Sequence, residues 1–296
     1  MSRVPDTERP WPAPAKLNLF LHVTGRRADG YHELQTVFQL LDWGDDVHIE
    51  VREDGYVTRA RDLPGVSEEQ DLSLRAARLL QSECGVRAGA RIGIEKRIPM
   101  GSGLGGASSD AATVLVALNR LWGCHLPNDD LAQLGLCLGA DVPVFVRGYS
   151  AWAEGVGEVL RPVRLGNAHF VVVTPGVHVS TAQVFAEPAL SRSTPRLAPV
   201  TCDQDARAWM SGTRNDCEAV VRRQLPALDE LARELGELGP ARMTGTGSAF
   251  FIPFDDEEAA LRVTTRLETR YNARAARGVD RSALLDRLEM VAAGGR

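Results

Sequence analysis

A glycine-rich segment, PMGSGLGGASSD, is the part of this 296-residue sequence best suited to holding a phosphate group. Its glycines have the spacing G-x-G-x-x-G and two serines follow them directly: Gly101, Gly103, Gly106, Ser108 and Ser109. Glycines let backbone N–H groups approach a phosphate, serine hydroxyls add donors, and the N-terminus of the helix predicted to follow supplies about half a positive charge. The segment therefore predicts a cradle for a nucleoside triphosphate.

Other interpretations of these glycines fit the neighbouring residues less well. A dinucleotide-binding loop needs a second parallel strand ending in Asp or Glu about 20 residues further on. Here the helix leads into another helix, whose first turn accounts for Asp129 and Asp130. A Walker loop needs a lysine where Ala107 stands, and the sequence lacks the H-R-D and D-F-G motifs of protein kinases. A loop whose glycines only permit close helix packing stays open as the alternative.

Three polar residues are placed to act on a bound phosphate. Residues 15–23 alternate in hydrophobicity with period two, which predicts a strand with Lys16 and Asn18 on one face. Asp141 follows a predicted helix, with Asn128 as its N-cap, and precedes an apolar run that predicts a short strand. An Asp can accept a hydroxyl proton and a lysine can stabilise phosphate charge. A solvated lysine and a turn-forming Asp are the ordinary roles of such residues, and the spacing alone does not exclude them.

Composition excludes several classes of partner. The formal net charge is −5, so no sequence-wide positive field is available to hold nucleic acid or an anionic membrane. No apolar run approaches the roughly 18 residues of a spanning helix. The first residues lack the apolar stretch of a signal peptide, so we expect a cytoplasmic protein. The five cysteines form no C-x-x-C pair and the six histidines show no metal-ligand spacing, which argues against disulfides and structural zinc.

The pattern of predicted elements favours an α+β fold with two lobes. Before residue 165 we expect strands over 15–23, 35–43, 45–54 and 90–99, with a turn at Gly44–Asp45, and helices over 71–85, 107–122 and 128–139. After it we expect strands over 169–174 and within 241–254, around a second glycine-rich loop, and helices over 180–185, 216–238 and 256–271. The mixing lacks the regular alternation of a doubly wound sheet. We place the boundary between the lobes at about residue 165.

These motifs resemble those of the GHMP kinase superfamily. The match to its central motif consists of Pro99, Gly103, Leu104, Gly105, Gly106, Ser108 and Ser109. Further matching segments are PAKLNLFLHVTGRRADGYHELQTVFQLLD, LGADVPVFVRG, AEGVGE, NDCE and TGTGSAFF. They occur in the right order from about residue 11 to 254, and the residues beyond 254 resemble the superfamily less clearly.

Within the superfamily the chain is most similar to the kinases that act on 4-diphosphocytidyl-2-C-methyl-D-erythritol. This resemblance implies an N-terminal ATP-binding lobe, like domain 2 of ribosomal protein S5, over residues 1–165 and a ferredoxin-like C-terminal lobe over 166–296. It implies ATP as co-substrate and phosphorylation of the 2-hydroxyl of that compound, a step of the non-mevalonate (MEP) route to isoprenoids. Mg²⁺ is expected with ATP, although its ligands are not evident from the sequence. We expect a monomer or a weak homodimer with no nucleic acid or membrane partner.

The resemblance also implies roles for individual residues. Lys16 and Asp141 match the catalytic pair, with Asp141 as general base and Lys16 keeping it ionised. The substrate site matches Asn18, Tyr31, His32, Thr181 and Phe185. In the cytidine part of that site, two aromatic rings sandwich the cytosine and the histidine reads its polar edge. The ATP site matches Asp71, Lys96, Pro99, Met100, Gly101, Ser102, Gly103, Leu104, Gly105, Gly106, Ala107, Ser108 and Ser109. A third motif that supports the cleft matches Thr244, Gly245, Thr246, Gly247 and Ser248.

Two departures and three rival functions accompany this interpretation. Asp71 stands where many members carry an Asn near the adenine, and Asp110 where some members carry an Asn.

One rival is another GHMP kinase, for a sugar, homoserine or a mevalonate-type alcohol, and the residues of the cytidine site argue against it. The others are a dinucleotide-binding oxidoreductase and a non-catalytic nucleotide-binding protein. Retention of both Lys16 and Asp141 argues against a protein without catalytic activity.

Overall fold

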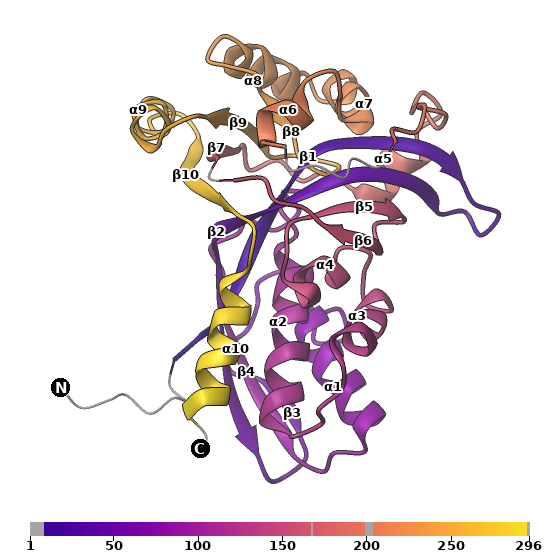
Figure 1. Ribbon diagram of the computed structural model, residues 1–296, viewed down its shortest axis with the longest axis vertical. Coiled ribbons are helices and arrows are strands. Elements are labelled where there is room, and N and C mark those ends of the chain that lie inside the picture. The colour runs from indigo at the N-terminus through magenta and orange to yellow at the C-terminus, as the bar shows by residue number, and fades with distance from the viewer. Residues whose placement is uncertain (1–8, 167, 199–203, 295–296) are drawn as a thin grey trace.

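The computed structural model describes residues 9–166, 168–198 and 204–294 and shows two lobes joined by a long β-ribbon (Figure 1). The first half of the chain contains β1 (Trp11–Arg26), β2 (His32–Arg52), β3 (Val57–Arg59), α1 (Leu72–Cys84), β4 (Gly89–Glu95), α2 (Gly106–Leu121), α3 (Asn128–Leu136), α4 (Val142–Arg147), β5 (Ala151–Gly155) and β6 (Val159–Pro162). The second half contains β7 (His169–Thr174), α5 (Thr181–Ala186), α6 (Ala206–Met210), α7 (Asp216–Gln224), α8 (Pro226–Gly236), β8 (Arg242–Met243), β9 (Phe250–Phe254), α9 (Glu257–Leu267), β10 (Asn272–Val279) and α10 (Ala283–Gly294). The α+β class is confirmed.

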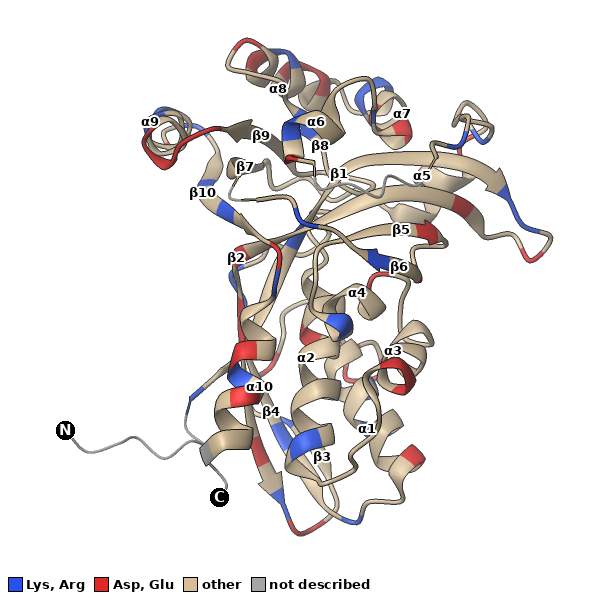
Figure 2. Ribbon diagram, in the orientation of Figure 1, with Lys and Arg blue, Asp and Glu red and all other residues tan. Residues whose placement is uncertain are grey.

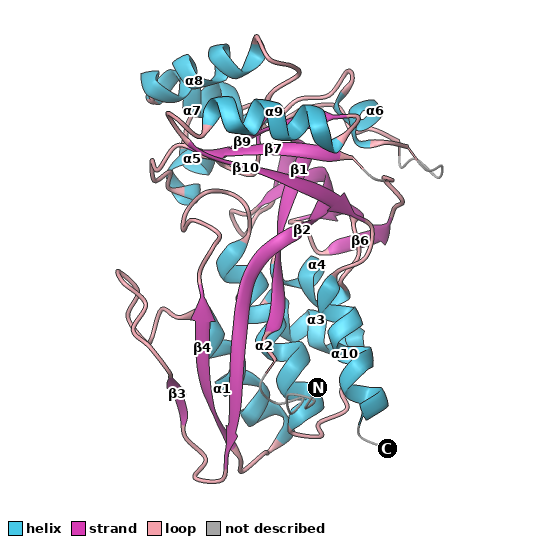
Figure 3. Cartoon of the chain, turned by 90° about the vertical axis from the view of Figure 1, so that its left-hand side faces the viewer, coloured by secondary structure: helices cyan, strands magenta, loops and turns pink. Residues whose placement is uncertain are grey.

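The ribbon of β1 and β2 runs through both lobes. β1 pairs antiparallel with β2 from Trp11 opposite Val47 to Arg26 opposite His32. The sheet path is β3-β4-β2-β10-β7-β9-β8, with β1, β5 and β6 beside it. β10 pairs with both β2 and β7, so it connects the strands of the two lobes. Figure 3 shows the long, curved β2 passing from the helices of the first lobe to the sheet of the second.

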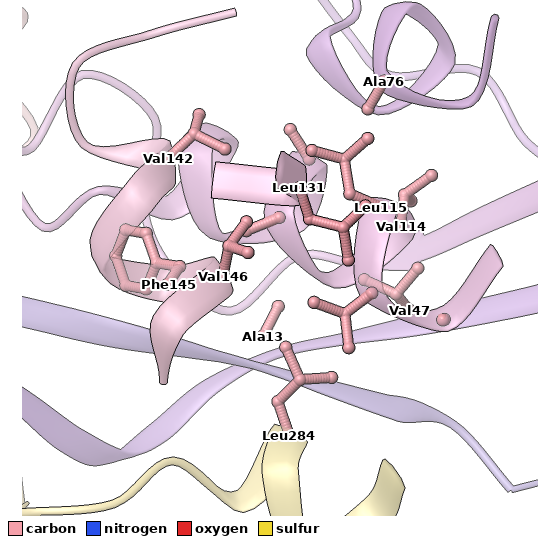
Figure 4. Close-up of a cluster of buried hydrophobic side chains, with 14 of the residues drawn as sticks. Ala13, Val47, Ala76, Val114, Leu115, Leu131, Val142, Phe145, Val146 and Leu284 are labelled. Carbon is pink, nitrogen blue, oxygen red and sulfur yellow. The ribbon is translucent and has the colours of Figure 1, made fainter. Parts of the chain in front are cut away.

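Three clusters of buried apolar side chains form the core, and β1 contributes to each of them. In the first lobe, Ala13 of β1 packs with side chains of α1, α2 and α4 and with Leu284 of α10 (Figure 4). Leu21 and Val23 pack with β7, β9, α7 and α8 in the second lobe. Leu17 lies in a third cluster, between the other two segments of the strand. The period-two pattern of residues 15–23 predicted this strand, but both of its faces are buried.

Two predicted elements are wrong. The apolar run after Asp141 forms helix α4, not a strand, with Pro143 in its first turn and Gly148 ending it at φ 71°. A short buried apolar run carries no periodicity that separates a strand from a helix. The strands predicted on either side of Gly44 are one strand, β2. A Cβ on Gly44 would lie 2.1 Å from the carbonyl oxygen of Ala13, so this glycine permits close strand pairing in place of a turn.

Helix boundaries differ from the expected ones at two prolines. Pro226 starts α8 and divides the helix predicted over 216–238 into α7 and α8, because proline lacks the N–H that a continuous helix requires. Pro127 occupies the N-cap position of α3, where Asn128 was expected. The helix predicted over 71–85 is confirmed as α1, with Asp71 as its N-cap and Gly85 as its left-handed C-cap.

The last helix, α10, returns to the first lobe. Leu284 is fully buried in the core of that lobe, and the helix contacts β1 and α2. Figure 1 shows α10, in yellow, within the first lobe. The boundary near residue 165 stays a prediction, and residues 283–294 pack against the lobe that precedes it.

Two further expectations concern membranes and cysteines. No helix within the described ranges is long and apolar enough to cross a membrane. The free cysteines in those ranges are Cys84, Cys124, Cys137 and Cys217. Cys202 lies outside the described residues.

Candidate active site

A cavity of about 870 Å³ lies where the glycine-rich segment, β1, β2 and α5 meet. It collects most of the residues that the sequence analysis singled out. Those lining it are Lys16, Asn18, Tyr31, His32, Lys96, Pro99, Met100, Gly101, Ser102, Gly103, Gly105, Gly106, Ala107, Ser108, Asp141, Thr181, Phe185, Gly245 and Thr246. Segments more than 200 residues apart in sequence therefore share one site, and its walls come from both lobes.

Some predicted residues lie outside the cavity wall. Among the described residues they are Asp71, Leu104, Ser109, Thr244, Gly247 and Ser248. Asp71 is buried at the start of α1, where Oδ1 accepts the N–H of Ser73 at 2.9 Å and Oδ2 accepts Nε–H of Arg59 at 2.7 Å. Both carboxylate oxygens are thus held by the chain itself. The structure therefore does not bring Asp71 together with the other predicted ATP-site residues.

Lys16 and Asp141 form an ion pair at the centre of the cavity. Lys16 Nζ lies 3.2 Å from Asp141 Oδ2, and the exposed fractions of the two side chains are 2% and 34%. Asp141 precedes α4, yet within the described residues its carboxylate caps no helical N–H. A turn-forming role therefore does not explain this side chain. The lysine is too deeply buried to be a solvated strand residue.

A series of hydrogen bonds through Asn18 holds the ammonium group of Lys16 in place. Its Nζ donates to Asn18 Oδ1 at 2.6 Å. Asn18 in turn donates through Nδ2 to Thr36 Oγ1 at 3.0 Å, and its backbone N–H donates to Thr244 Oγ1 at 2.9 Å. These bonds keep the amide oxygen of Asn18 directed at Lys16. Asn18 therefore belongs to the support of the ion pair as well as to the cavity wall.

The glycine-rich segment needs glycine for both conformation and space. Gly101, Gly103 and Gly105 have φ values of 67°, 79° and 78°, in the left-handed region that disfavours side chains. A Cβ on Gly103 would lie 2.4 Å from the carbonyl oxygen of Thr244, and one on Gly105 would lie 2.8 Å from Cζ of Phe145. Close packing, the alternative that the sequence leaves open, is therefore one reason for these glycines.

The same segment also starts a helix that borders the cavity. α2 begins at Gly106, and its N-cap has no side chain to bond the first N–H groups. Gly106, Ala107 and Ser108 line the cavity at this helix N-terminus. Exposed N–H groups and the helix dipole favour an anion at such a position. The packing and the phosphate-binding interpretations are thus compatible.

Lys96 lies beside this helix and is held by two carboxylates. Its Nζ is 2.5 Å from Asp45 Oδ2 and 2.8 Å from Asp110 Oδ2. Burial opposes the charge of Lys96, but the two carboxylates outweigh burial and raise its pKa. Burial, together with the nearby charge of Asp45, raises the pKa of Asp110 to about 7. Asp110 is thus part of an internal charge cluster beside the N-terminus of α2.

An aromatic contact forms another part of the cavity wall. The rings of His32 and Phe185 stack with their centroids 4.9 Å apart and their planes at 21°. Tyr31, the neighbour of His32 in the chain, also lines the cavity and is 63% exposed. Thr181, at the first turn of α5, exchanges a hydrogen bond of 2.9 Å with Thr246. The residues predicted for the substrate therefore line the same cavity as the glycine-rich segment.

Several cavity residues were missed by sequence reasoning. They include Arg26, Asp29, Thr36, Phe38 and Gly157. Thr36 and Phe38 lie on β2 opposite Leu21 and Asn18 of β1. Only the register between the two strands would have pointed to them, and a single sequence does not contain that register. Arg26 and Asp29 lie within GRRADGYHEL, a matching segment in which only Tyr31 and His32 were predicted to bind substrate.

The fold and this cavity define a kinase of the GHMP class. The profile described as GHMP kinases N terminal domain matches residues 71–149, and the one described as GHMP kinases C terminal matches residues 197–273. Together these matches span more than half of the chain and both of its lobes. The chain therefore belongs to the GHMP kinases.

Similarity over almost the whole chain narrows the class to one family. The chain is 54% identical over 284 residues to 4-diphosphocytidyl-2-C-methyl-D-erythritol kinase of Xanthomonas axonopodis pv. citri (strain 306), covering 95% of each protein. It is also 54% identical to the enzyme of the same name from Halorhodospira halophila (strain DSM 244 / SL1), covering 93% of this chain and 94% of that protein. A crystal structure of 4-(cytidine 5′-diphospho)-2C-methyl-D-erythritol kinase matches with a TM-score of 0.77 and 38% identity, over 90% of this chain and 98% of that one. Within the GHMP kinases, the chain belongs to the family of 4-diphosphocytidyl-2-C-methyl-D-erythritol kinases.

Proposed function

We propose that this protein transfers the γ-phosphoryl group of ATP to the 2-hydroxyl of 4-diphosphocytidyl-2-C-methyl-D-erythritol, giving the 2-phosphate and ADP. This reaction is a step of the non-mevalonate (MEP) route to isoprenoid precursors. The observation that carries the proposal is the ion pair of Lys16 and Asp141 in a cavity that is also lined by the glycine-rich segment and by the stacked rings of His32 and Phe185. The names of the relatives support the choice of substrate.

Asp141 acts as the general base in this proposal. Its partly exposed carboxylate can reach the cavity, where it accepts the proton of the 2-hydroxyl as the oxygen attacks the γ-phosphorus. Lys16 Nζ contacts Asp141 at 3.2 Å and stabilises negative charge on the transferring group. The N–H groups at the start of α2 bind the phosphates of ATP. Most of the rate enhancement would come from such positioning and charge stabilisation.

Mg²⁺ accompanies ATP in this proposal. Among the described residues, no group of three or more His, Cys, Asp and Glu side chains could hold a metal ion. Mg²⁺ usually takes few protein ligands and several from water and substrate phosphates, so this arrangement fits it. Ser108 lines the cavity at the first turn of α2, and the buried Oγ of Ser109 has no partner among the described residues. Hydroxyls at these positions would hold the ion, which would neutralise charge on the β- and γ-phosphates.

One assay separates this proposal from its rivals. ADP formation from ATP and Mg²⁺ is measured in parallel with 4-diphosphocytidyl-2-C-methyl-D-erythritol, galactose, homoserine and mevalonate. We expect turnover with the first compound and at least 100-fold lower kcat/KM with the others, because a missing base removes roughly 1–3 kcal/mol of stacking and also its hydrogen bonds. Turnover with another acceptor and none with the first would contradict the proposal. So would catalysis of hydride transfer to NAD or NADP.

The cellular setting forms part of the same proposal. We place the protein in the cytoplasm, where ATP and the cytidine compound are both available, and expect a monomer or a weak homodimer. Basic and acidic side chains are interspersed over both lobes, which fits a small-molecule substrate (Figure 2). Sedimentation equilibrium at micromolar and millimolar concentrations tests the oligomeric state.

A further inference from the structure

One arginine outside the cavity wall contacts both members of the aromatic pair. Arg192 follows α5, and its Nε donates to Nε2 of His32 at 3.0 Å. The other end of the guanidinium donates to the carbonyl oxygens of Phe185 at 2.7 Å, Glu187 at 2.9 Å and Leu190 at 3.1 Å. Figure 2 shows basic segments at the end of β1 and in the loop after α5, on the same side of the molecule. A single side chain thus connects a residue of β2 with the end of α5.

The bond from Arg192 decides which nitrogen of His32 carries a proton. A guanidinium can only donate, so Nε2 of His32 must accept and be unprotonated. The neutral imidazole therefore carries its proton on Nδ1. Burial, and then the charges of Arg192 and Arg26, lower the pKa of His32, which keeps the ring neutral at pH 7. Nδ1 of His32 has no hydrogen-bond partner among the described residues, so its N–H is available to a ligand.

Arg192 also holds the backbone of Phe185, whose ring stacks on His32. α5 is a short helix of six residues, and its last carbonyl groups have no partner within the helix. Arg192 supplies donors to the carbonyls of Phe185 and Glu187 and so holds the end of α5. A base inserted between two rings needs them roughly 7 Å apart, twice a carbon–carbon contact distance. The centroids of His32 and Phe185 are only 4.9 Å apart, so a base would bind beside this pair and not between its two rings.

We propose that Arg192 is a positioning residue for base recognition, which holds His32 against Phe185 with Nδ1–H as the donor presented to the base. This inference rests on the proposed function and adds a source of specificity to it. N3 of cytosine is an acceptor and can bond Nδ1–H, whereas O2 is an acceptor in both cytosine and uracil and does not distinguish them. Uracil carries a hydrogen on N3, so the same donor would face a donor there. The arrangement therefore selects a cytidine diphosphate group over a uridine diphosphate group.

Binding measurements on the full chain test this proposal. Dissociation constants for CDP, UDP and ADP are measured by calorimetry for the wild type, Arg192→Gln and Arg196→Gln. Arg196 is the matched control, because it lies in the same segment and pairs with Glu33 at 3.3 Å. We expect Arg192→Gln to weaken CDP binding roughly 10- to 100-fold, as the loss of a charged hydrogen bond does, and to reduce the preference for CDP over UDP. ADP binding and the control should change less than twofold.

The protonated nitrogen of His32 gives a second readout that structural damage alone would not mimic. Nitrogen-15 NMR of the wild type, with His32→Gln to assign the signal, should show a protonated Nδ1 and an unprotonated Nε2. Arg192→Gln should populate the other tautomer and raise the pKa of His32. A wild type protonated on Nε2 would overturn the proposal even if the variant failed to fold. Equal weakening of CDP, UDP and ADP, or unchanged CDP affinity, would also overturn it. A wild type that binds no CDP would instead count against the proposed function.

Discussion

Gly103 lies directly against Thr244, although 141 residues separate them in the chain: a Cβ on Gly103 would stand 2.4 Å from the carbonyl oxygen of Thr244. Nearby, the N–H of Ala249 donates to the carbonyl oxygen of Ser102 at 3.0 Å. The glycine-rich segment of the first lobe is therefore packed against a glycine-rich loop of the second. Movement of one lobe relative to the other would disturb this contact.

Gly103→Ala should destabilise the protein and weaken ATP binding. The added methyl group meets backbone, which cannot rotate away, and φ is +79°, so we expect a loss on the order of 2–5 kcal/mol in the free energy of unfolding. Gly65→Ala is the control, because Gly65 has φ +78° and a Cβ there would meet nothing within 4 Å. It should lose only about 1 kcal/mol. Urea denaturation measures both values, and equal losses would contradict the packing argument.

Asp141→Asn should abolish phosphoryl transfer while leaving the fold intact. Removal of a general base lowers kcat by roughly 10²- to 10⁴-fold. Its carboxylate caps no helix among the described residues, so the loss of the ion pair with Lys16 is the main reason to expect a lower melting temperature. Steady-state ADP formation and thermal denaturation are the measurements. Asp129→Asn, at an exposed carboxylate paired with Arg147 at 3.0 Å, is the matched control and should keep wild-type kcat. Unchanged kcat in Asp141→Asn would remove Asp141 from the mechanism.

Thr36→Val should lower kcat through the support of Lys16. The substitution removes the acceptor of Asn18 Nδ2 and leaves that amide unsatisfied in a buried place, which costs about 1–3 kcal/mol. If half of that cost appears at the transition state, kcat falls roughly 3- to 10-fold. Thr36→Ser retains the hydroxyl and should recover wild-type kcat. A variant that raises KM alone, with kcat unchanged, would contradict this role.

Phe185→Ala should weaken binding of the cytidine group and spare nucleotide binding at the glycine-rich segment. The ring of Phe185 packs against His32 beside the proposed base site. An aromatic contact with a base contributes about 1–3 kcal/mol, so the dissociation constant for CDP should rise roughly 5- to 150-fold. Calorimetry with CDP and ADP makes the comparison. Loss of ADP binding with CDP binding spared would contradict the assignment of Phe185 to the substrate.

Asp110→Asn should make stability less sensitive to pH. The pKa of Asp110 is raised from 3.8 to about 7, so folding favours the protonated acid. Its contribution to stability is fully present below pH 4 and is lost as the pH rises through 7. The free energy of unfolding of Asp110→Asn, relative to the wild type, should therefore increase between pH 5 and pH 8. We expect a change on the order of 1–2 kcal/mol. Urea denaturation at both pH values checks this, and a decrease would contradict the sign.

The residues that could be predicted from the sequence are those in continuous motifs. Lys16, Asp141 and the glycine-rich segment stand out by residue type and spacing, and the cavity brings them together. Thr36 escaped detection because its role depends on the register between β1 and β2, and Arg192 because it acts through His32 from a segment without a motif. Such contacts arise only when distant parts of the chain pack together.

The element boundaries show the same limit. Caps at the ends of α1 are local, so its start and end could be predicted, whereas the apolar run of α4 contains no local signal to choose between helix and strand. Asp71 shows the converse. Its alignment with an Asn that lies near the adenine in many family members predicted a contact with ATP. Its carboxylate is instead hydrogen-bonded to the N–H of Ser73 and to Arg59.

The passage of β1 through all three clusters couples the two lobes thermodynamically. A chain divided at residue 165 would leave one piece without Leu284 and the other without Leu21 and Val23. Each piece would then carry exposed apolar surface and an unfilled interior, so neither half is an autonomous folding unit. Unfolding should accordingly proceed as one cooperative transition, in which the calorimetric and van't Hoff enthalpies agree. Selection for stability in this enzyme therefore acts on the whole chain and not on each lobe separately.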